Sequence, residues 1–128
     1  MIFNKSLATS DGDLMVIYHD DFHHKVRRLQ RKEPRLWQLI FSGLRTALDG
    51  GRKDEIPGLG GWIKIRLPAP SLGIGKRGGF RLVFLYLKIG KTVYLGQVYF
   101  KREKPDLSPF EKSQLLDAAK AIKAAFRK

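Results

Sequence analysis

The stretch of sequence that decides the fold runs from residue 60 to residue 104 and contains three apolar runs. They read GGWIKIRL at 60–67, GGFRLVFLYL at 78–87 and TVYLGQVYFKR at 92–102. Each run is rich in β-branched and aromatic residues and is bounded by Gly, Pro or Lys, a pattern typical of β-strands. The stretch therefore predicts three successive antiparallel strands.

Lysine and arginine stand inside these predicted strands. Because successive strand residues point to opposite faces of a sheet, Lys64 and Arg66 share the face opposite their apolar neighbours. Arg81 interrupts the second run, and Lys101 and Arg102 end the third. The pattern favours a basic face with a functional role, and an ordinary solvated sheet face is the alternative.

The chain carries a large excess of positive charge. Its 128 residues include 25 Lys or Arg and 12 Asp or Glu, which gives a formal net charge of +13. Residues 52–104 contain twelve of these cations and only three of the acids. Such a field favours phosphate-bearing partners, chiefly nucleic acid, although an acidic protein or an anionic membrane would also be attracted.

Length and composition limit the class of protein. A chain of 128 residues suits one domain with its own core. The absence of cysteine excludes disulfides, thiolate metal sites and a cysteine nucleophile. The first residues lack the pattern of a signal peptide, and the longest apolar run, at 82–87, is far too short to span a bilayer. We therefore expect a cytoplasmic protein without a membrane partner.

The rest of the chain predicts a leader, one more strand and three helices. Residues 1–12 end in a Thr-Ser-Asp-Gly turn and are interpreted as a turn-like or frayed, flexible leader, so a single domain is expected over residues 13–128. Residues 14–18 predict a strand. Ser108 and Glu111 form the capping box of the last helix. The apolar stripes of the three helices are Phe22, Val26 and Leu29; Trp37, Ile40, Phe41, Leu44 and Leu48; and Leu115, Ala119, Ile122 and Phe126.

Three histidines, at positions 19, 23 and 24, stand close together in the sequence. Two of them, four residues apart, could share a helical face and bind a metal ion. The predicted helix begins between those two residues, which removes the helical spacing. We therefore expect no metal site.

The connection at 68–79 is irregular and glycine-rich. Its glycines do not follow the spacing of a phosphate-binding P-loop. One interpretation is a basic lip beside the sheet, in which Lys76 and Arg77 contact a nucleic-acid backbone. A plain flexible hairpin loop is the other.

The three strand motifs, followed by KREKPDLS at 101–108, together resemble the RelE/HigB group of type II toxin–antitoxin toxins, in the RelE/ParE superfamily. The resemblance covers roughly residues 14–125. It implies a small α+β fold with a twisted antiparallel sheet, an N-terminal helical pair and a C-terminal helix. It also implies a ribosome-dependent mRNA interferase, an endoribonuclease that cuts translated mRNA in the ribosomal A site, beside the rRNA, and is neutralised by a cognate antitoxin protein.

The resemblance implies a catalytic site without metal or cofactor at Lys64, Arg66, Arg81, Lys101 and Arg102. Such cleavage needs a base for the 2′-hydroxyl, positive charge at the phosphate and an acid for the leaving 5′-oxygen. Lys64 or Lys101 is the candidate base, and Arg81 is the candidate phosphate clamp. Arg66 and Arg102 are candidate phosphate ligands or leaving-group donors. The predicted RNA-binding residues are Lys76, Arg77, Lys104 and Phe110.

The sequence departs from the family at one position. RelE-like proteins carry a tyrosine shortly after the terminal cations, whereas this chain offers Phe110, which can stack on a base but has no hydroxyl. Tyr99 supplies a hydroxyl only if it faces the site. Two alternatives remain open: a ParE-like inhibitor of DNA gyrase with the same fold, and a nucleic-acid-binding module that is not an enzyme.

Overall fold

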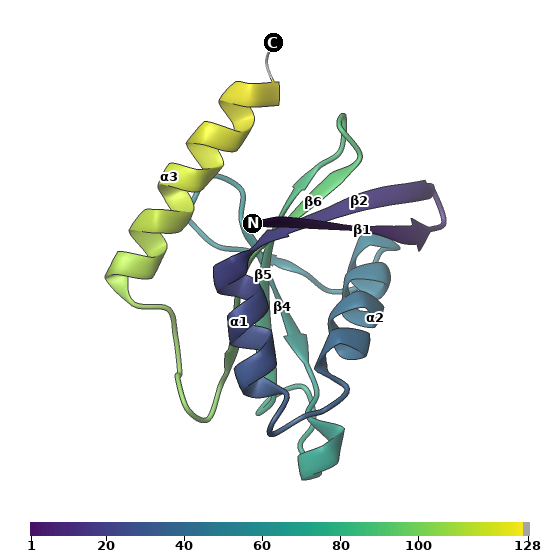
Figure 1. Ribbon diagram of the computed structural model, residues 1–128, viewed down its shortest axis with the longest axis vertical. Helices are drawn as coiled ribbons and strands as arrows, with labels where there is room; N and C mark the ends of the chain where they lie inside the picture. Colours follow the sequence, from purple (N-terminus) through teal and green to yellow (C-terminus); the bar gives the residue numbers. More distant parts are fainter. Residues whose placement is uncertain (127–128) are drawn as a thin grey trace.

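The computed structural model describes residues 1–126, which form an α+β domain (Figure 1). Residues 127 and 128, the end of the predicted domain, lie outside the described part. The strands are β1 (Ile2–Thr9), β2 (Gly12–His19), β3 (Asp54–Glu55), β4 (Ile63–Leu67), β5 (Phe80–Leu87) and β6 (Thr92–Phe100). The helices are α1 (Asp20–Leu29), α2 (Leu36–Leu48) and α3 (Pro109–Phe126), with a 3-10 turn, η1, at Pro70–Leu72.

The six strands form one sheet in the order β1-β2-β6-β5-β4-β3. Strands β4, β5 and β6 pair antiparallel, as the three apolar runs predict. In contrast, β2 and β6 pair in parallel. The sheet is therefore mixed, and the prediction of an antiparallel sheet is wrong for this pair. The chain leaves the sheet after β2 through α1 and α2 and returns on the far side, so β6 arrives beside β2 in the same direction (Figure 1).

The first residues form a strand, and the prediction of a turn-like leader is wrong. Strand β1 pairs with β2 along its whole length, from Ile2 opposite His19 to Thr9 opposite Gly12. Gly12 has a φ of 110°, which a glycine adopts without strain in a tight turn. Leu7 is buried in the main core, so the hairpin belongs to the domain.

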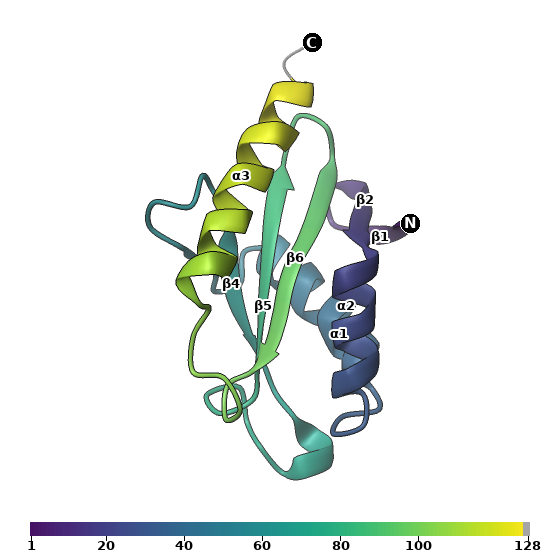
Figure 2. The same cartoon turned by 60° about the vertical axis from the view of Figure 1, so that its left-hand side comes forward.

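Helices cover both faces of the sheet (Figure 2). Helices α1 and α2 lie on one face over the larger core cluster, and α3 lies on the other over a smaller one. The stripe residues in the larger cluster are Phe22, Val26, Leu29, Ile40 and Leu44. The smaller cluster contains Leu59, Trp62, Val83, Leu85, Tyr99, Leu107, Leu115 and Ala119. No helix of the described chain has both the length and the apolar character that a bilayer crossing requires.

Some residues of the predicted apolar stripes lie outside the fully buried core. Trp37 and Phe41 are half-buried at its rim, where the Nζ atom of Lys5 lies 4.9 and 5.7 Å from their ring centroids. Phe126 is 44% exposed, so its predicted burial is wrong. Its ring lies against Gly90 in the turn between β5 and β6, where no further layer covers it.

The start of α3 confirms the predicted capping box. The Glu111 N–H donates to the Ser108 hydroxyl at 3.1 Å, and the Ser108 N–H donates to the Glu111 carboxylate at 2.8 Å. Further along, the indole N–H of Trp62 donates to the Leu115 carbonyl at 2.6 Å. This bond ties the middle of α3 to the start of β4, and so fixes the helix over the sheet.

Candidate functional site

Four of the five predicted catalytic residues line one groove, here called the basic groove. Lys64 and Arg66 reach it from β4, Arg81 from β5 and Lys101 from just beyond β6. The groove has a volume of about 310 Å³. Its wall is completed by Asp54, Glu55, Ile56 and Pro57.

The alternation of side chains along the strands explains why these cations meet. On β4, the apolar side chains of Ile65 and Leu67 are buried under α2, as predicted, while Arg66 between them is exposed. On β5, Arg81 has the same parity as Val83, which packs under α3. The basic groove therefore lies on the face of the sheet that carries α3.

A row of three polar residues crosses the sheet here, and its two arginines line the groove. Arg81 lies directly opposite Arg66 on β4 and opposite Tyr99 on β6. Like charges directly opposite each other repel. Burial and the neighbouring Arg66 both lower the pKa of Arg81 from its ordinary value. An anion bound between the two guanidinium groups would offset this repulsion.

Arg81 also holds the loop at 68–79. Its side chain is only 5% exposed, and its guanidinium donates to the carbonyls of Lys76 at 3.0 Å and Arg77 at 2.9 Å. A third bond, of 3.3 Å, reaches the carbonyl of Phe80. A guanidinium has five N–H donors, so two remain for a phosphate. Arg66, which is exposed, is the more accessible guanidinium of the pair.

Glu33, in the connection between α1 and α2, holds the other end of the loop. Its buried carboxylate accepts the Ser71 N–H at 2.7 Å, the Ser71 hydroxyl at 2.6 Å and the Arg35 N–H at 3.3 Å. Burial by itself would raise the pKa of Glu33, but the hydrogen bonds from Ser71 and Arg35 outweigh it and lower the pKa below its ordinary value of 4.5. Charged side chains therefore fix the loop at both ends.

The unfolding free energy is expected to fall as the pH drops below about 4.5, partly through Glu33. Because the pKa of Glu33 is lower in the folded than in the unfolded chain, its ionised form stabilises the fold above pH 4.5, and this contribution is lost as the pH falls through the folded-state value. Glu33→Gln should lower the unfolding free energy at neutral pH by about 1.5–3 kcal/mol, the range for hydrogen bonds to charged groups.

Urea unfolding of both proteins across the acid range measures the Glu33 contribution. Asp106 and Glu111 also have lowered pKa values, so wild type and variant share part of the acid dependence. Only the difference between the two curves belongs to Glu33. If the unfolding free energies of wild type and Glu33→Gln differed by the same amount at every pH, the lowered pKa would not belong to Glu33.

Tyr99 shares the face of Arg81, but it lies beneath the basic groove. Its side chain is 4% exposed and packs in the cluster under α3, and it is absent from the groove lining. Burial, followed by the Asp106 carboxylate, raises the pKa of Tyr99 to about 12. The phenol is therefore protonated at neutral pH, as a proton donor must be, but a substrate in the groove does not reach it without a shift of the chain.

The other predicted site residues do not line the basic groove. Arg102 is exposed and lies beside Gly78 of the loop. Lys104 forms an ion pair with Glu111 at the start of α3. Phe110, in the first turn of α3, is 70% exposed and belongs to neither core cluster. Lys76 and Arg77 are exposed on the loop, and Lys76 faces the α2 side of β4.

Two acidic residues that the sequence pattern did not mark as site residues also line the groove. Asp54 and Glu55 make up β3, where they pair with Lys64 and Ile63 of β4. Their one signal in the sequence is that they are two of only three acids in the basic region 52–104. Within residues 1–126, the Glu55 carboxylate forms no ion pair. It is therefore free to accept a hydrogen bond from a ligand in the groove.

The three histidines lie away from the groove, near the hairpin of β1 and β2. The ring of His23 stacks on Phe3 at a centroid distance of 4.6 Å, and its buried Nδ1 has no partner among the described residues. Among those residues, no three side chains of the metal-ligating types lie together.

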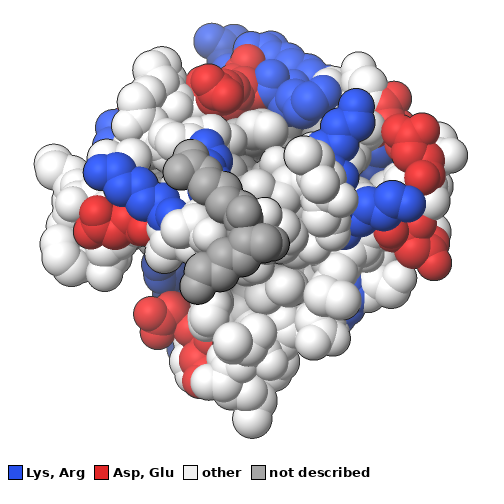
Figure 3. Space-filling view, turned by 90° about the horizontal axis from the view of Figure 1, so that it is seen from above, with Lys and Arg blue, Asp and Glu red and all other residues white. Residues whose placement is uncertain are grey.

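The end of the molecule at which α3 ends, seen from above Figure 1, differs from the basic groove in its charge distribution. Acidic and basic side chains alternate there around a largely uncharged surface (Figure 3).

No protein-family model matches the sequence. The function is therefore inferred from the groove and its chemistry.

Proposed function

We propose that the protein is the toxin of a type II toxin–antitoxin system, a metal-free endoribonuclease that cuts translated mRNA in the ribosomal A site. One observation carries the proposal: Lys64 and Arg66 of β4, Arg81 of β5 and Lys101 just beyond β6 line one groove. Positioned cations of this kind stabilise the charge that develops on a phosphate during transfer.

The arrangement of elements around the groove supports the same proposal. Helices α1 and α2, the antiparallel strands β4 to β6 and the C-terminal helix α3 follow one another in the order that the resemblance to the RelE/HigB group implies. We infer that the fold is RelE-like, with β1 as an added edge strand. A cognate antitoxin that covers the basic groove would neutralise the toxin.

The proposed reaction needs no metal. The 2′-oxygen attacks the adjacent phosphorus and loses its proton, the bond from phosphorus to the 5′-oxygen breaks, and that oxygen takes up a proton. The products are a 2′,3′-cyclic phosphate and a 5′-hydroxyl. Arg66 and Arg81 stabilise the negative charge on the phosphate oxygens in the transition state.

We assign the two proton transfers to Lys64 and Lys101. Along the sheet, Lys64 lies on one side of the Arg66–Arg81 pair, and Lys101, whose N–H donates to the Gly79 carbonyl, lies on the other. In the proposed reaction one of them accepts the 2′-proton and the other donates a proton to the 5′-oxygen. Glu55 is a second candidate for the base.

The test is cleavage in a translating extract by the wild type and by the double variant Lys64→Ala/Arg66→Ala. The wild type should cut the message and leave cyclic phosphate ends, and the double variant should not. A matched control, Arg27→Ala/Arg31→Ala, removes the same charge from exposed positions of the α1 region and should cut normally. A single 2′-deoxy nucleotide at the cut position should block cleavage there. Equal cleavage by the two double variants would contradict the site.

Two observations favour one alternative, a nucleic-acid-binding module without activity. Arg81 spends three donors on backbone carbonyls, and Tyr99 is buried. Such a module would bind RNA with a steep salt dependence and leave it intact. A protein that leaves mRNA intact but inhibits supercoiling by gyrase would instead support the ParE-like function.

A further inference from the structure

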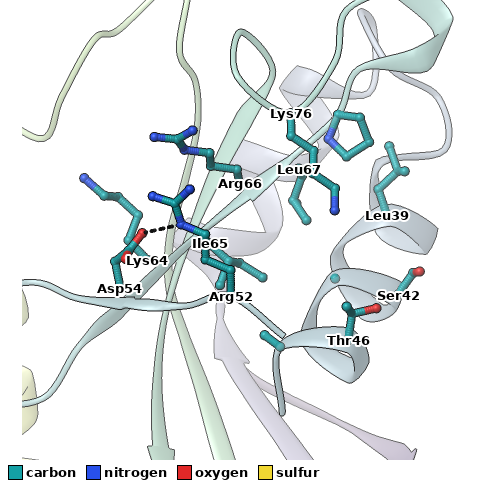
Figure 4. A pocket seen from close by; sticks show the side chains of 13 residues that line it. Leu39, Ser42, Thr46, Arg52, Asp54, Lys64, Ile65, Arg66, Leu67 and Lys76 are labelled. Carbon is teal, nitrogen blue, oxygen red and sulfur yellow. Dashed lines mark ion pairs between the residues drawn. The ribbon is translucent and has the colours of Figure 1, made fainter. Parts of the chain in front are cut away.

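A second basic depression, here called the edge pocket, lies on the α2 side of β4 (Figure 4). It has a volume of about 330 Å³ and is bounded by β4, α2 and the loop at 68–79. Its charged residues are Arg52, Asp54, Lys64, Arg66 and Lys76, and its hydroxyl groups come from Ser42 and Thr46 on α2.

The backbone of β4 is open in this pocket. Strand β3 pairs only with Ile63 and Lys64, so no strand lies beside residues 65–67 on this edge. The N–H of Ile56 donates to the Trp62 carbonyl across the same edge. In an antiparallel ladder the peptide groups of every second residue point to the same side. The N–H and C=O of Arg66 therefore point into the edge pocket.

Helix α2 closes the floor of the pocket. Gly43 packs so tightly against the Leu67 side chain that a methyl group at this position would clash with it. Ser42 and Thr46, next to Gly43 on the helix surface, are exposed and line the pocket (Figure 4). The pocket therefore combines a closed apolar floor with hydroxyl groups on its wall.

Most of the positive charge in the edge pocket is unpaired. Asp54 lies 3.6 Å from Nε of Arg52, the one ion pair drawn among the residues that line the pocket (Figure 4). The side chains of Arg66 and Lys76 form no ion pair with any residue of the described chain. One carboxylate thus faces four cations, which leaves a strong site for an anion.

We propose that the edge pocket binds a nucleotide that flanks the one held in the basic groove, so that a single RNA strand crosses β4. The two depressions share Asp54, Lys64 and Arg66, which stand on the ridge between them. Arg52 and Lys76 hold the flanking phosphate, and the N–H of Arg66 and the hydroxyls of Ser42 and Thr46 bind phosphate or ribose oxygens. The inference rests on the proposed function, because it extends the path of that RNA.

An acidic peptide is the competing ligand, and the edge is too short for it. A peptide that adds a strand to a sheet gains its affinity from a series of main-chain hydrogen bonds. Here β4 ends at Leu67, and only the peptide groups of Arg66 are open. The cations shared with the basic groove favour one continuous polyanion.

The test measures binding of RNA that cannot be cleaved. A trinucleotide and an octanucleotide with 2′-O-methyl groups are titrated at several salt concentrations, with fluorescence anisotropy as the readout. The wild type should bind the longer RNA more tightly. Arg52→Ala should weaken binding of the longer RNA only. It should also lower the magnitude of the slope of log K against log salt by about 0.7, the value for one phosphate contact to a single strand. Arg31→Ala, which removes an exposed charge elsewhere, should leave the length preference intact.

A second pair of variants tests the space rather than the charge. Ser42→Phe fills the pocket without a change in charge and should remove the preference for the longer RNA. Gln38→Phe adds the same side chain to an exposed position of α2 outside the pocket lining and should keep the preference.

Three outcomes decide the inference. Equal weakening of both RNAs by Arg52→Ala would overturn it, because Arg52 would then act only through the general field. The pocket would instead belong to a protein partner if two results came together. The wild type would bind poly-glutamate more tightly than Arg52→Ala does, and it would show no preference for the longer RNA. A length preference lost in Arg52→Ala and Ser42→Phe supports it. These RNAs are never cut, so failure of the proposed nuclease activity appears separately, as intact message in the translating extract.

Discussion

Arg81→Ala is expected to lower the rate of mRNA cleavage roughly 10²–10³-fold, the usual loss when one donor to a developing negative charge is removed. Two effects combine at this residue. The charge opposite Arg66 disappears from the groove, and the loop loses the donor that holds the carbonyls of Lys76 and Arg77. Single-turnover cleavage of translated message measures the rate, and growth arrest on expression reports it in cells.

Arg81→Lys separates the two effects. A lysine keeps the charge, but its single ammonium does not reproduce the planar fork that reaches two carbonyls. If charge dominates, Arg81→Lys should retain most of the activity; if the loop dominates, it should resemble Arg81→Ala. Limited trypsin digestion after Lys76 and Arg77 reports release of the loop directly. Cleavage of message by Arg81→Ala at the wild-type rate would show that neither effect matters for catalysis.

Trp62→Ala is expected to lower the unfolding free energy by about 3–5 kcal/mol, the range for truncating a buried aromatic side chain. Trp62 is fully buried under α3, against Gly96 and Leu115. The substitution would leave a cavity and also remove the bond from the indole N–H to the Leu115 carbonyl. Helix α3 would then lose both this hydrogen bond and the packing of the indole ring.

Trp62→Phe is the matched variant. It keeps much of the apolar contact and removes the hydrogen bond, so its cost beyond lost volume should be about 1 kcal/mol. Phe110→Ala, at an exposed position of the same helix, should change stability by less than about 0.5 kcal/mol. Guanidinium unfolding measures all three. A midpoint that does not move in Trp62→Ala would show that α3 is held by other contacts.

The sequence was sufficient to predict β4, β5 and β6 and the start of α3. Alternation along β4 placed Lys64 and Arg66 on one face, and the pair Ser108 and Glu111 marked the helix start, because both signals are local. Strand β1 has no such signal: Asn4, Lys5 and Ser6 are poor strand residues, and pairing with β2 creates the strand. The parallel pairing of β2 with β6 could not be predicted either, because the alternation of apolar and polar residues along a strand does not encode which strand lies beside it.

The composition of the candidate site was partly predictable for the same reason. The alternation of side chains along the strands predicts that Lys64, Arg66 and Arg81 share one face. It does not predict where the charged end of a long side chain lies. The bonds from Arg81 to the loop carbonyls depend on how the irregular segment 68–79 folds back. Likewise, Glu33 contacts Ser71 only because two loops meet in space. Beyond β6, the turn that follows the strand directs Arg102 away from the groove.

The parallel junction between β2 and β6 has a consequence for the order in which the chain folds. The hairpin of β1 and β2 and the meander of β4 to β6 join neighbours in sequence, so each closes only short loops. Met15, however, pairs with Thr92, and this distant contact costs more loop-closure entropy and forms more slowly. On the ribosome, the hairpin emerges long before β6 exists. The central junction therefore closes only after β6 has been synthesised, and a nascent chain that ends before Lys101 carries no complete groove.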